Sequence, residues 1–248
     1  NIDVNIKSKI KSKKSYQNLW PIDQYYLITE ERTALHEAVE SGYAEIVHFL
    51  MQNKSFNIDS TFIKTTEYND LHSTANDYYD ENYKEIILHY AIERGYIGII
   101  KLLLSNPKIN INMKSRSEIR KGGGCVSYYR CYMEIERSSL FYAIENENIN
   151  VIDLLLEQPT IDVNFGMIEY LSDYTVDHGI FQEKPPLFLA VEMQNLEIVK
   201  LLLKHPKIVV NYVSKYCTYQ NNQKISQRMT ARELASEKSN KEIRLLLK

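Results

Sequence analysis

The sequence predicts an all-α fold: a solenoid of stacked helix-turn-helix units, joined by extended loops that resemble β-hairpins. Two observations lead to this prediction. A phrase with a central alanine returns five times, and an apolar run at helical spacing follows it. Such self-similarity indicates an array of small units that bury a common core by stacking on one another. The phrases are TALHEAVESG from Thr33, IILHYAIERG from Ile86, SSLFYAIENE from Ser138, PPLFLAVEMQ from Pro185 and TARELASEKS from Thr230.

The phrase predicts the first helix of each unit. In the first unit this helix runs from Thr33 to about Ser41, and Leu35, Ala38 and Val39 fall on one of its faces. The other four units have the alanine and apolar residues at corresponding positions, so we expect the same helix in each of them.

A tight turn is predicted after this helix. Gly42 and Gly95 stand there in two units, and Asn148 and Asn195 stand one position later in two others. Both residue types tolerate the left-handed backbone conformation that such a turn requires.

The apolar run predicts the second helix of each unit. Ile46, Phe49 and Leu50 are spaced as one face of a helix. Three units then have a proline, followed by alternating apolar and polar residues such as IDVN and IVVN.

The central alanines define the units. They are Ala38, Ala91, Ala143, Ala190 and Ala235, spaced 53, 52, 47 and 45 residues apart. The sequence predicts one array over residues 1–248, in which residues 1–5 are the tail of a preceding unit and the chain is part of a longer protein. The units lie near residues 33–59, 86–112, 138–164, 185–211 and 230–248, and long fingers occupy residues 6–32, 60–86, 113–137, 165–184 and 212–229.

The pattern T-x-L-H-x-A, a glycine, E-I-V-x-x-L-L and D-V-N resembles the ankyrin repeat, most closely in TALHEAVESGYAEIVHFL from Thr33. Ankyrin units have about 33 residues, so each unit here carries an insert of roughly 12 to 20 residues where the family has its β-turn finger. Segments such as D-V-N-I-K-S are similar to those of large protist ankyrin families. The resemblance implies a protein that holds partners in a concave groove.

The histidine of the family phrase is present in only two units. In the family it forms hydrogen bonds that hold neighbouring turns together, and it corresponds here to His36 and His89. Phe141, Phe188 and Glu233 replace it in the other units. We expect aromatic packing to take over its role there.

The fingers are rich in tyrosine, which gives rigid contact area at low entropic cost and is common in binding loops. The same rings also suit paired strands, so finger-on-finger packing is an equal alternative, and both can hold at once. The tyrosines proposed to contact a partner are Tyr78, Tyr79, Tyr128, Tyr129, Tyr132, Tyr170, Tyr174, Tyr216 and Tyr219.

The net charge of the fingers alternates in sign along the chain, from +3 through −4, +3 and −3 to +3. Stacked neighbours then meet opposite charge, which predicts lateral attraction between fingers. Chance is the alternative with five segments, and exposed pairs contribute at most about 1 kcal/mol each.

A glutamate stands two residues after each central alanine: Glu40, Glu93, Glu145, Glu192 and Glu237. The resemblance places this position and the next one, where Arg94 stands, on the concave groove. The functional interpretation is a partner that is basic or donates hydrogen bonds. The alternative is a solvated helix face, since glutamate is a good helix former.

Composition narrows the classes of function. A net charge of −2 gives no general attraction to nucleic acid, and no apolar run approaches a membrane span. The three cysteines lack metal-ligand spacing, which favours reduced thiols in the cytoplasm. The six histidines form no recognisable metal pair or catalytic triad, so we expect no metal, no cofactor and no catalysis.

The sequence therefore predicts a non-catalytic scaffold or adaptor that binds a protein partner through the groove and the tyrosine-rich fingers. Two alternatives stay open: a targeting or regulatory region of a larger enzyme or channel, and a structural component associated with the cytoskeleton.

Overall fold

The fold combines helices and strands in equal measure. The computed structural model describes residues 5–15, 24–53, 57, 61–70, 78–123, 129–173, 178–220 and 223–247, in which ten helices alternate pairwise with ten strands. The prediction of an all-α fold is therefore wrong. The segments between the helix pairs are long enough to form full strands, and these strands pair across unit boundaries into one antiparallel sheet.

Each unit consists of a hairpin, an inner helix and an outer helix. The inner helices are α1 (Ala34–Glu40), α3 (Ile87–Glu93), α5 (Ser139–Glu145), α7 (Pro186–Glu192) and α9 (Ala231–Glu237). The outer helices are α2 (Ala44–Met51), α4 (Ile97–Leu104), α6 (Ile149–Leu156), α8 (Leu196–Lys204) and α10 (Lys241–Leu246). The strands are β1 (Lys7–Ser15), β2 (Gln24–Thr33), β3 (Thr61–Asp70), β4 (Tyr78–Ile86), β5 (Lys114–Gly123), β6 (Tyr129–Ser138), β7 (Met167–Asp173), β8 (His178–Lys184), β9 (Val213–Gln220) and β10 (Gln223–Thr230).

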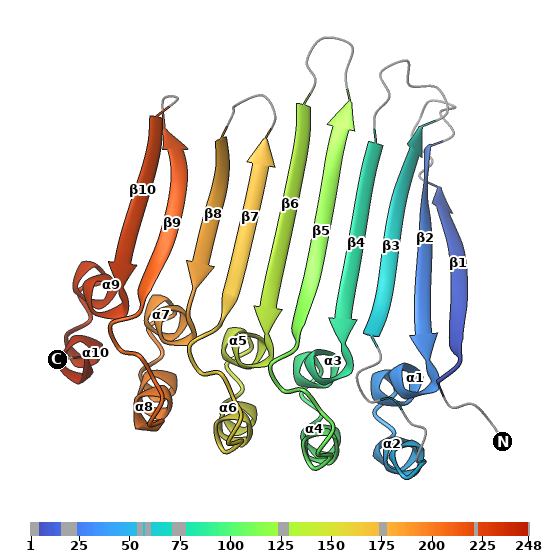
Figure 1. Cartoon of the computed structure of the whole chain (residues 1–248), viewed down its shortest axis with the longest axis horizontal. Coiled ribbons are helices and arrows are strands. Elements are labelled where there is room, and N and C mark those ends of the chain that lie inside the picture. Colours follow the sequence, from blue (N-terminus) through green and yellow to red (C-terminus); the bar gives the residue numbers. More distant parts are fainter. Residues whose placement is uncertain are drawn as a thin grey trace.

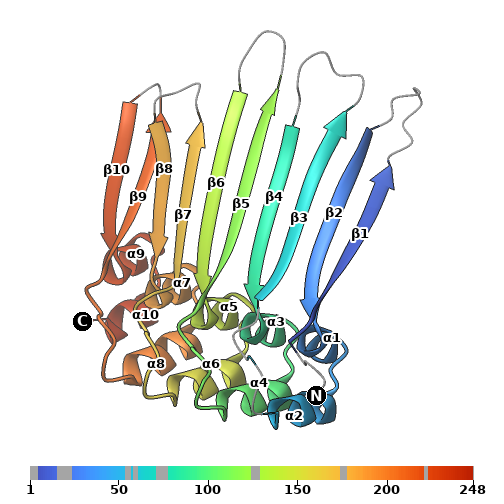
Figure 2. The same ribbon diagram turned by 45° about the vertical axis from the view of Figure 1, so that its right-hand side comes forward.

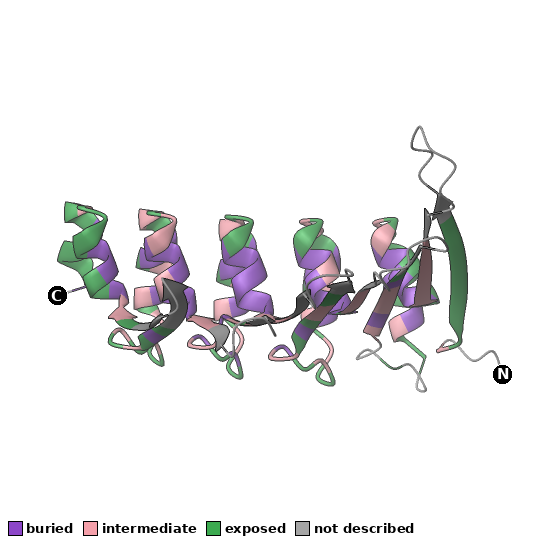
Figure 3. Cartoon of the chain, turned by 90° about the horizontal axis from the view of Figure 1, so that it is seen from above, coloured by how far each residue is buried: buried purple, intermediate pink, exposed green. Residues whose placement is uncertain are grey.

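The sheet extends above the helices, and we call it the wall (Figure 1). Its antiparallel strands lie in chain order from β1 to β10, and all of them extend to the same side of the inner helices (Figure 2). Seen from above, the sheet follows one side of the helical row, and β1 and α10 lie at opposite ends of the array (Figure 3). Wall and helices together form an L-shaped cross-section.

Each even-numbered strand runs almost directly into an inner helix. β2 ends at Thr33 and α1 begins at the next residue, and four of the five units share this direct junction. Ser138 and Thr230 cap α5 and α9 by accepting the backbone N–H of the residue three positions on. Pro186 starts α7, at a position where its missing N–H leaves no hydrogen bond unmade.

The turn between inner and outer helix has a left-handed residue in every unit. Gly42 and Gly95 have φ of 72° and 68°, as the sequence predicts for glycine. In the other units the left-handed residues are Glu147, Gln194 and Ser239. The prediction that asparagine takes this conformation is wrong, because the side chains of Asn148 and Asn195 instead cap α6 and α8.

The core lies between the inner and outer helices and continues from unit to unit, as the purple faces in Figure 3 show. Leu35, Leu88 and Leu140 are fully buried at the same position of successive inner helices. Stacking of these apolar faces supplies most of the stabilisation, because the short helices are not stable alone.

The two predicted histidines bond in different ways. His89 Nε2 lies 2.9 Å from Ser139 Oγ and so joins the second unit to the third. His36 Nδ1 accepts the backbone N–H of Thr33 at 3.0 Å, within its own unit. In the fifth unit the Glu233 carboxylate takes over that bond, accepting the Thr230 N–H at 2.7 Å. In the fifth unit a carboxylate therefore replaces the histidine as the hydrogen-bond acceptor, whereas aromatic packing was expected at this position.

Asparagines at the tails of the units link neighbours. Asn112 donates to the Thr160 carbonyl at 2.7 Å and accepts the Asp162 N–H at 2.8 Å. Asn164 repeats this one unit later, donating to the Lys207 carbonyl at 2.9 Å and accepting the Val209 N–H at 2.8 Å. The D-V-N tail thus satisfies the backbone of the next unit.

The strand register sets which finger charges meet. Glu30 lies opposite Lys64 across two neighbouring hairpins, but Lys84 lies opposite Arg116, a like charge. Among the described residues, Lys215 and Glu183 form an ion pair between hairpins, with the Nζ and Oε2 atoms 3.8 Å apart. Lateral attraction between fingers stays a prediction.

Within the described ranges, no helix is long and apolar enough to cross a membrane.

Candidate functional site

A row of five side chains lies where the wall meets the inner helices. These corner residues stand six positions before each central alanine, near the ends of the even-numbered strands: Arg32, Glu85, Arg137, Lys184 and Met229. Side chains alternate between the two faces of a strand, so the whole row faces the helices if one member does. Lys184 shows this directly, because its Nζ donates to the last residue of α7.

The glutamate column lies at the other side of the same corner. Each of its members, from Glu40 to Glu237, is the last residue of an inner helix. In the first unit Arg32 forms an ion pair with Glu40, and in the fourth unit Lys184 Nζ lies 2.7 Å from Glu192 Oε2. These cations offset the unfavourable placement of a carboxylate at a helix C-terminus.

The column is therefore divided rather than uniform. Glu40 and Glu192 are half-buried and paired with a corner cation, whereas Glu93, Glu145 and Glu237 are exposed. Within the described part of the chain, none of these three exposed carboxylates has an ion pair.

The second unit places an acid where its neighbours have a cation. Glu85 is only 2% exposed, and its Oε1 has no hydrogen-bond partner in the described part of the protein. Burial, and then the like charge of Glu93, raise the pKa of Glu85 to about 7. The Tyr83 hydroxyl opposes this shift by hydrogen bonding to the carboxyl, and burial raises the pKa of Tyr83 as well. Glu85 is thus about half protonated near pH 7.

A buried aromatic cluster fills the corner of the third unit. The Tyr142 hydroxyl lies 3.0 Å from Ser115 Oγ, and the guanidinium carbon of Arg137 lies 5.8 Å from the centre of its ring. The ring of His89 packs 4.8 Å away, and burial lowers the pKa of His89 to about 3. His89 is therefore neutral near pH 7 and packs against Tyr142 as an uncharged ring.

Arg94, the other predicted groove residue, is exposed next to the column. Its Nη2 donates to the Tyr90 hydroxyl at 3.2 Å, and its guanidinium carbon lies 5.3 Å from the centre of that ring. Arg94 is therefore held by Tyr90 of α3, and its place on a groove surface stays a prediction.

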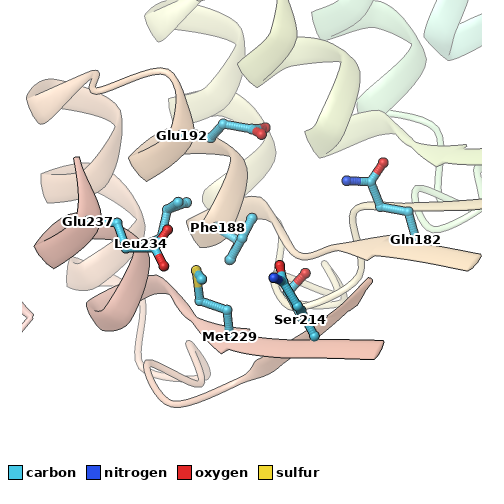
Figure 4. A pocket seen from close by; sticks show the side chains of 8 residues that line it. Gln182, Phe188, Glu192, Ser214, Met229, Leu234 and Glu237 are labelled. Atoms are coloured by element: carbon cyan, nitrogen blue, oxygen red, sulfur yellow. The ribbon is translucent and has the colours of Figure 1, made fainter. Parts of the chain in front are cut away.

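A pocket of about 250 Å³ opens between α7 and α9 (Figure 4). Phe188, Met229 and Leu234 supply its apolar surface, and the carboxylates of Glu192 and Glu237 lie at its helix side. Gln182, Ser214 and Gln227 supply its polar surface from the strands.

Two of the proposed tyrosines lie on the opposite face of the wall. Tyr132 and Tyr170 stand at positions of opposite parity to the corner residues, so they face away from the helices. Their ring centres are 6.3 Å apart at 57°, and the Tyr132 hydroxyl donates to Glu134 Oε2 at 2.7 Å. Burial and this hydrogen bond raise the pKa of Tyr132. Tyr170 is 41% exposed.

The structure does not bring these tyrosines and the glutamate column together. The backbones of Tyr78, Tyr79, Tyr129, Tyr216 and Tyr219 lie in strands, but their side chains are outside the described part of the structure. Tyr128 and Tyr174 lie outside the described residues altogether.

Comparison with protein families bears on the helix pairs. Residues 22–115 match a family model described as ankyrin repeats in three copies, and residues 183–215 match the model of an ankyrin repeat; the two ranges together span just over half of the chain. The chain belongs to the ankyrin repeat family. The resemblance that the sequence predicts is thus confirmed. No curated protein matched the chain.

Ankyrin repeats are generally protein–protein interaction modules, so the groove is the place to look for function. The corner residues and the pocket were not predicted from the sequence, because the corner residues lie in fingers that look like variable inserts. Aligning the units on their central alanines gives the missing signal: the position six residues earlier reads Arg, Glu, Arg, Lys and Met.

Proposed function

We propose that this ankyrin repeat chain is a non-catalytic scaffold that holds a protein partner in the groove between the wall and the inner helices. One observation carries the proposal: ten strands pair continuously into a sheet that rises above the helices. An ordinary stack of helix pairs is stabilised by its own helical core, so the wall adds surface beyond what the core requires.

The size of this surface suits a protein. At a strand spacing of about 4.8 Å, ten strands span roughly 43 Å, and strands of seven to ten residues rise about 25 Å. One face therefore offers on the order of 1,000 Å², compared with about 800 Å² per partner in a stable interface. The pocket of about 250 Å³ is smaller than most small-molecule sites.

The charge of the groove favours a basic segment of the partner. Glu93, Glu145 and Glu237 are exposed along its helix side, and the described residues place no cation in contact with them. Such a row of charge steers a partner and sets its register more than it adds affinity. Tyr132 and Tyr170, on the outer face, form a second surface that can be tested separately.

The separation of two of the three cysteines supports a reduced, cytoplasmic setting as part of this proposal; Cys125 lies outside the described residues. Cys131 in β6 and Cys217 in β9 are separated by two strands, so strand spacing places their Cα atoms at least roughly 14 Å apart. A disulfide needs Cα atoms within about 7 Å.

Site-specific photo-crosslinking tests the proposal. A photoreactive amino acid is placed at Glu145 in the groove, at Tyr170 on the outer face, or at Glu157, which is exposed beyond the outer helix α6. In cells that express the chain, we expect a discrete crosslinked protein from Glu145 and none from Glu157. Crosslinking from Tyr170 alone moves the interface to the outer face, and equal labelling from all three positions contradicts a specific scaffold.

A further inference from the structure

We propose that the pocket between α7 and α9 receives one long cationic side chain, a lysine or an arginine, from the protein partner. This inference rests on the proposed function, because the partner supplies that side chain. It names the chemistry by which the groove recognises a partner and the place where it does so.

The four junctions between units can be compared with one another. A slot between the wall and two successive inner helices occurs four times, once at each junction of units. At the first junction Phe62 fills it, with its ring centre 6.5 Å from that of Tyr90. At the second, Tyr142 fills it and bonds to Ser115. At the third, the buried side chain of Met167 and the stem of Lys184 fill it.

A pocket opens in the fourth slot, among the residues that the structure describes. The strand position held by Phe62, Ser115 and Met167 is Ser214 there. The helix position held by Tyr90, Tyr142 and Leu189 is Leu234 there. The first two slots have an aromatic ring at one or both of these positions and the third combines Met167 with Leu189, whereas the fourth combines a serine with a leucine. The open volume of about 250 Å³ results from this combination.

The third slot shows what kind of group fits. Lys184 reaches from the end of β8 to α7, with its side chain only 18% exposed and its Nζ 2.7 Å from Glu192 Oε2. In the fourth slot Met229 stands at the corner position, and no cation among the described residues forms an ion pair with Glu237. The slot therefore keeps its carboxylate but lacks the cation.

The lining matches a side chain that is apolar along its stem and charged at its end. Phe188, Met229 and Leu234 provide the surface for the stem, and Glu237 provides the partner for the head, because Glu192 is already paired (Figure 4). Lysine and arginine bury their stems in this way while the charge stays near water. At about 30 Å³ per molecule, the slot holds roughly eight waters that such a stem would displace.

The test uses capped tripeptides with a single variable residue, read by the NMR signal of the Met229 methyl group in the full chain. Ac-Gly-Arg-Gly-NH₂ and Ac-Gly-Lys-Gly-NH₂ carry the proposed group, and Ac-Gly-norleucine-Gly-NH₂ carries an apolar stem without charge. We expect a saturable shift with the cationic peptides and about five-fold weaker binding of the norleucine peptide, as one partly exposed ion pair contributes. Equal binding of all three peptides, or no saturable shift, overturns the proposal.

Variants locate the site. Glu237→Gln should weaken binding of the arginine peptide about five-fold, whereas Glu157→Gln, exposed beyond the outer helix α6, should leave it unchanged. Ser214→Phe and Leu234→Tyr each give the fourth slot the side chain of a filled one, and either should abolish the shift. Two variants are used so that a folding defect in one does not decide the result, and thermal unfolding confirms that each is folded.

These outcomes are independent of the scaffold proposal. If a partner crosslinks from Glu145 as strongly to Ser214→Phe and Leu234→Tyr as to the unaltered chain, the scaffold stands and the slot proposal is wrong. If the arginine peptide binds the slot but no partner crosslinks from the groove, the scaffold proposal fails and the slot keeps its chemistry.

Discussion

Glu85 shows how one residue can change the behaviour of a repeated position. The first and fourth units place a cation at the corner, and that cation pairs with the column. Glu85 instead meets the like charge of Glu93 while almost fully buried, which raises its pKa to about 7 from an ordinary value of 4.5. The unfolded chain ionises Glu85 near pH 4.5, whereas the folded protein keeps it protonated until about pH 7. Its contribution to stability is therefore complete below pH 4.5 and is lost as the pH rises through 7.

Glu85→Gln should remove this loss. A shift of about 2.5 pH units corresponds to roughly 3 kcal/mol at pH 8, so the variant should be more stable there by up to that amount and nearly unchanged at pH 4.5. Urea unfolding at pH 5, 6, 7 and 8 measures it, with the exposed Glu145→Gln as control. If the free energies of unfolding of Glu85→Gln and the unaltered chain run parallel across this range, the assignment of the raised pKa to Glu85 is wrong.

At Gly166 the backbone passes close to the backbone of Lys184. A Cβ at this position would overlap the carbonyl oxygen of Lys184, and the Gly166 carbonyl accepts the Ser138 N–H at 2.9 Å. Gly166→Ala should therefore destabilise the protein by about 1–3 kcal/mol, as backbone shifts in packed sites do.

Gly98→Ala is the matched control, because a Cβ there meets nothing within 4 Å. Gly98 lies inside α4, where alanine is the better helix former, so we expect a gain of up to about 1 kcal/mol. Chemical denaturation compares the two, and a loss of stability in both would show that space is not the deciding factor at Gly166.

At the scale of single elements, the helices followed from the sequence and the wall did not. The apolar period of about 3.6 marks one buried face on each helix, which predicts the helix pairs and their turns. A strand with one buried face shows polar and apolar residues in alternation. The sequence of β1 is KSKIKSKKS and has no apolar face. The wall lies above the helices, so neither of its faces is covered by the helical core (Figure 1). Local pattern therefore allows hairpins but cannot show that neighbouring hairpins pair.

For the candidate site, too, the residues on helices could be predicted from the sequence and those that depend on the strands could not. The glutamate column is visible as a repeated letter in a helix, and the structure places each member at the end of an inner helix. Its division into paired and unpaired members depends on residues eight positions earlier, in strands whose face the sequence does not fix. The open slot depends on Ser214 and Leu234, which come together only after both helix and strand are placed.

Asn164→Ala tests the links between units. It removes the bonds to the Lys207 carbonyl and from the Val209 N–H, which connect the third unit to the fourth. Because both bonds are exposed and water can replace them in part, we expect a loss of about 1–2 kcal/mol in urea unfolding. Asn106→Ala is the control, since Asn106 accepts only the nearby Lys108 N–H among the bonds found. Equal losses in both variants would contradict a role in joining units.

For the whole molecule, position in the array decides what a residue contributes. Ile46 and Ile198 occupy the same position of their outer helices, yet Ile46 is 48% exposed and Ile198 is fully buried between α6 and α10 neighbours in the continuous core. In a linear array each unit contacts only its neighbours, so burial depends on the units on either side.

Ile198→Ala should cost about 2–5 kcal/mol, whereas the identical change at Ile46 should cost less than about 1 kcal/mol. Chemical denaturation of both single variants measures the difference. Similar costs would show that Ile46 is covered in solution, for example by self-association, which sedimentation would then reveal.

The wall gives this protein two independent ways to change the size of the surface proposed to bind a partner. Adding a unit lengthens the groove by two strands, as in any solenoid. Lengthening a hairpin deepens the groove at one place, without altering a single residue of the helical core, because the added residues lie above it. Length and depth are therefore encoded in separate parts of the sequence. A chain built in this way can acquire a new contour for a new partner while the residues that make it fold remain unchanged.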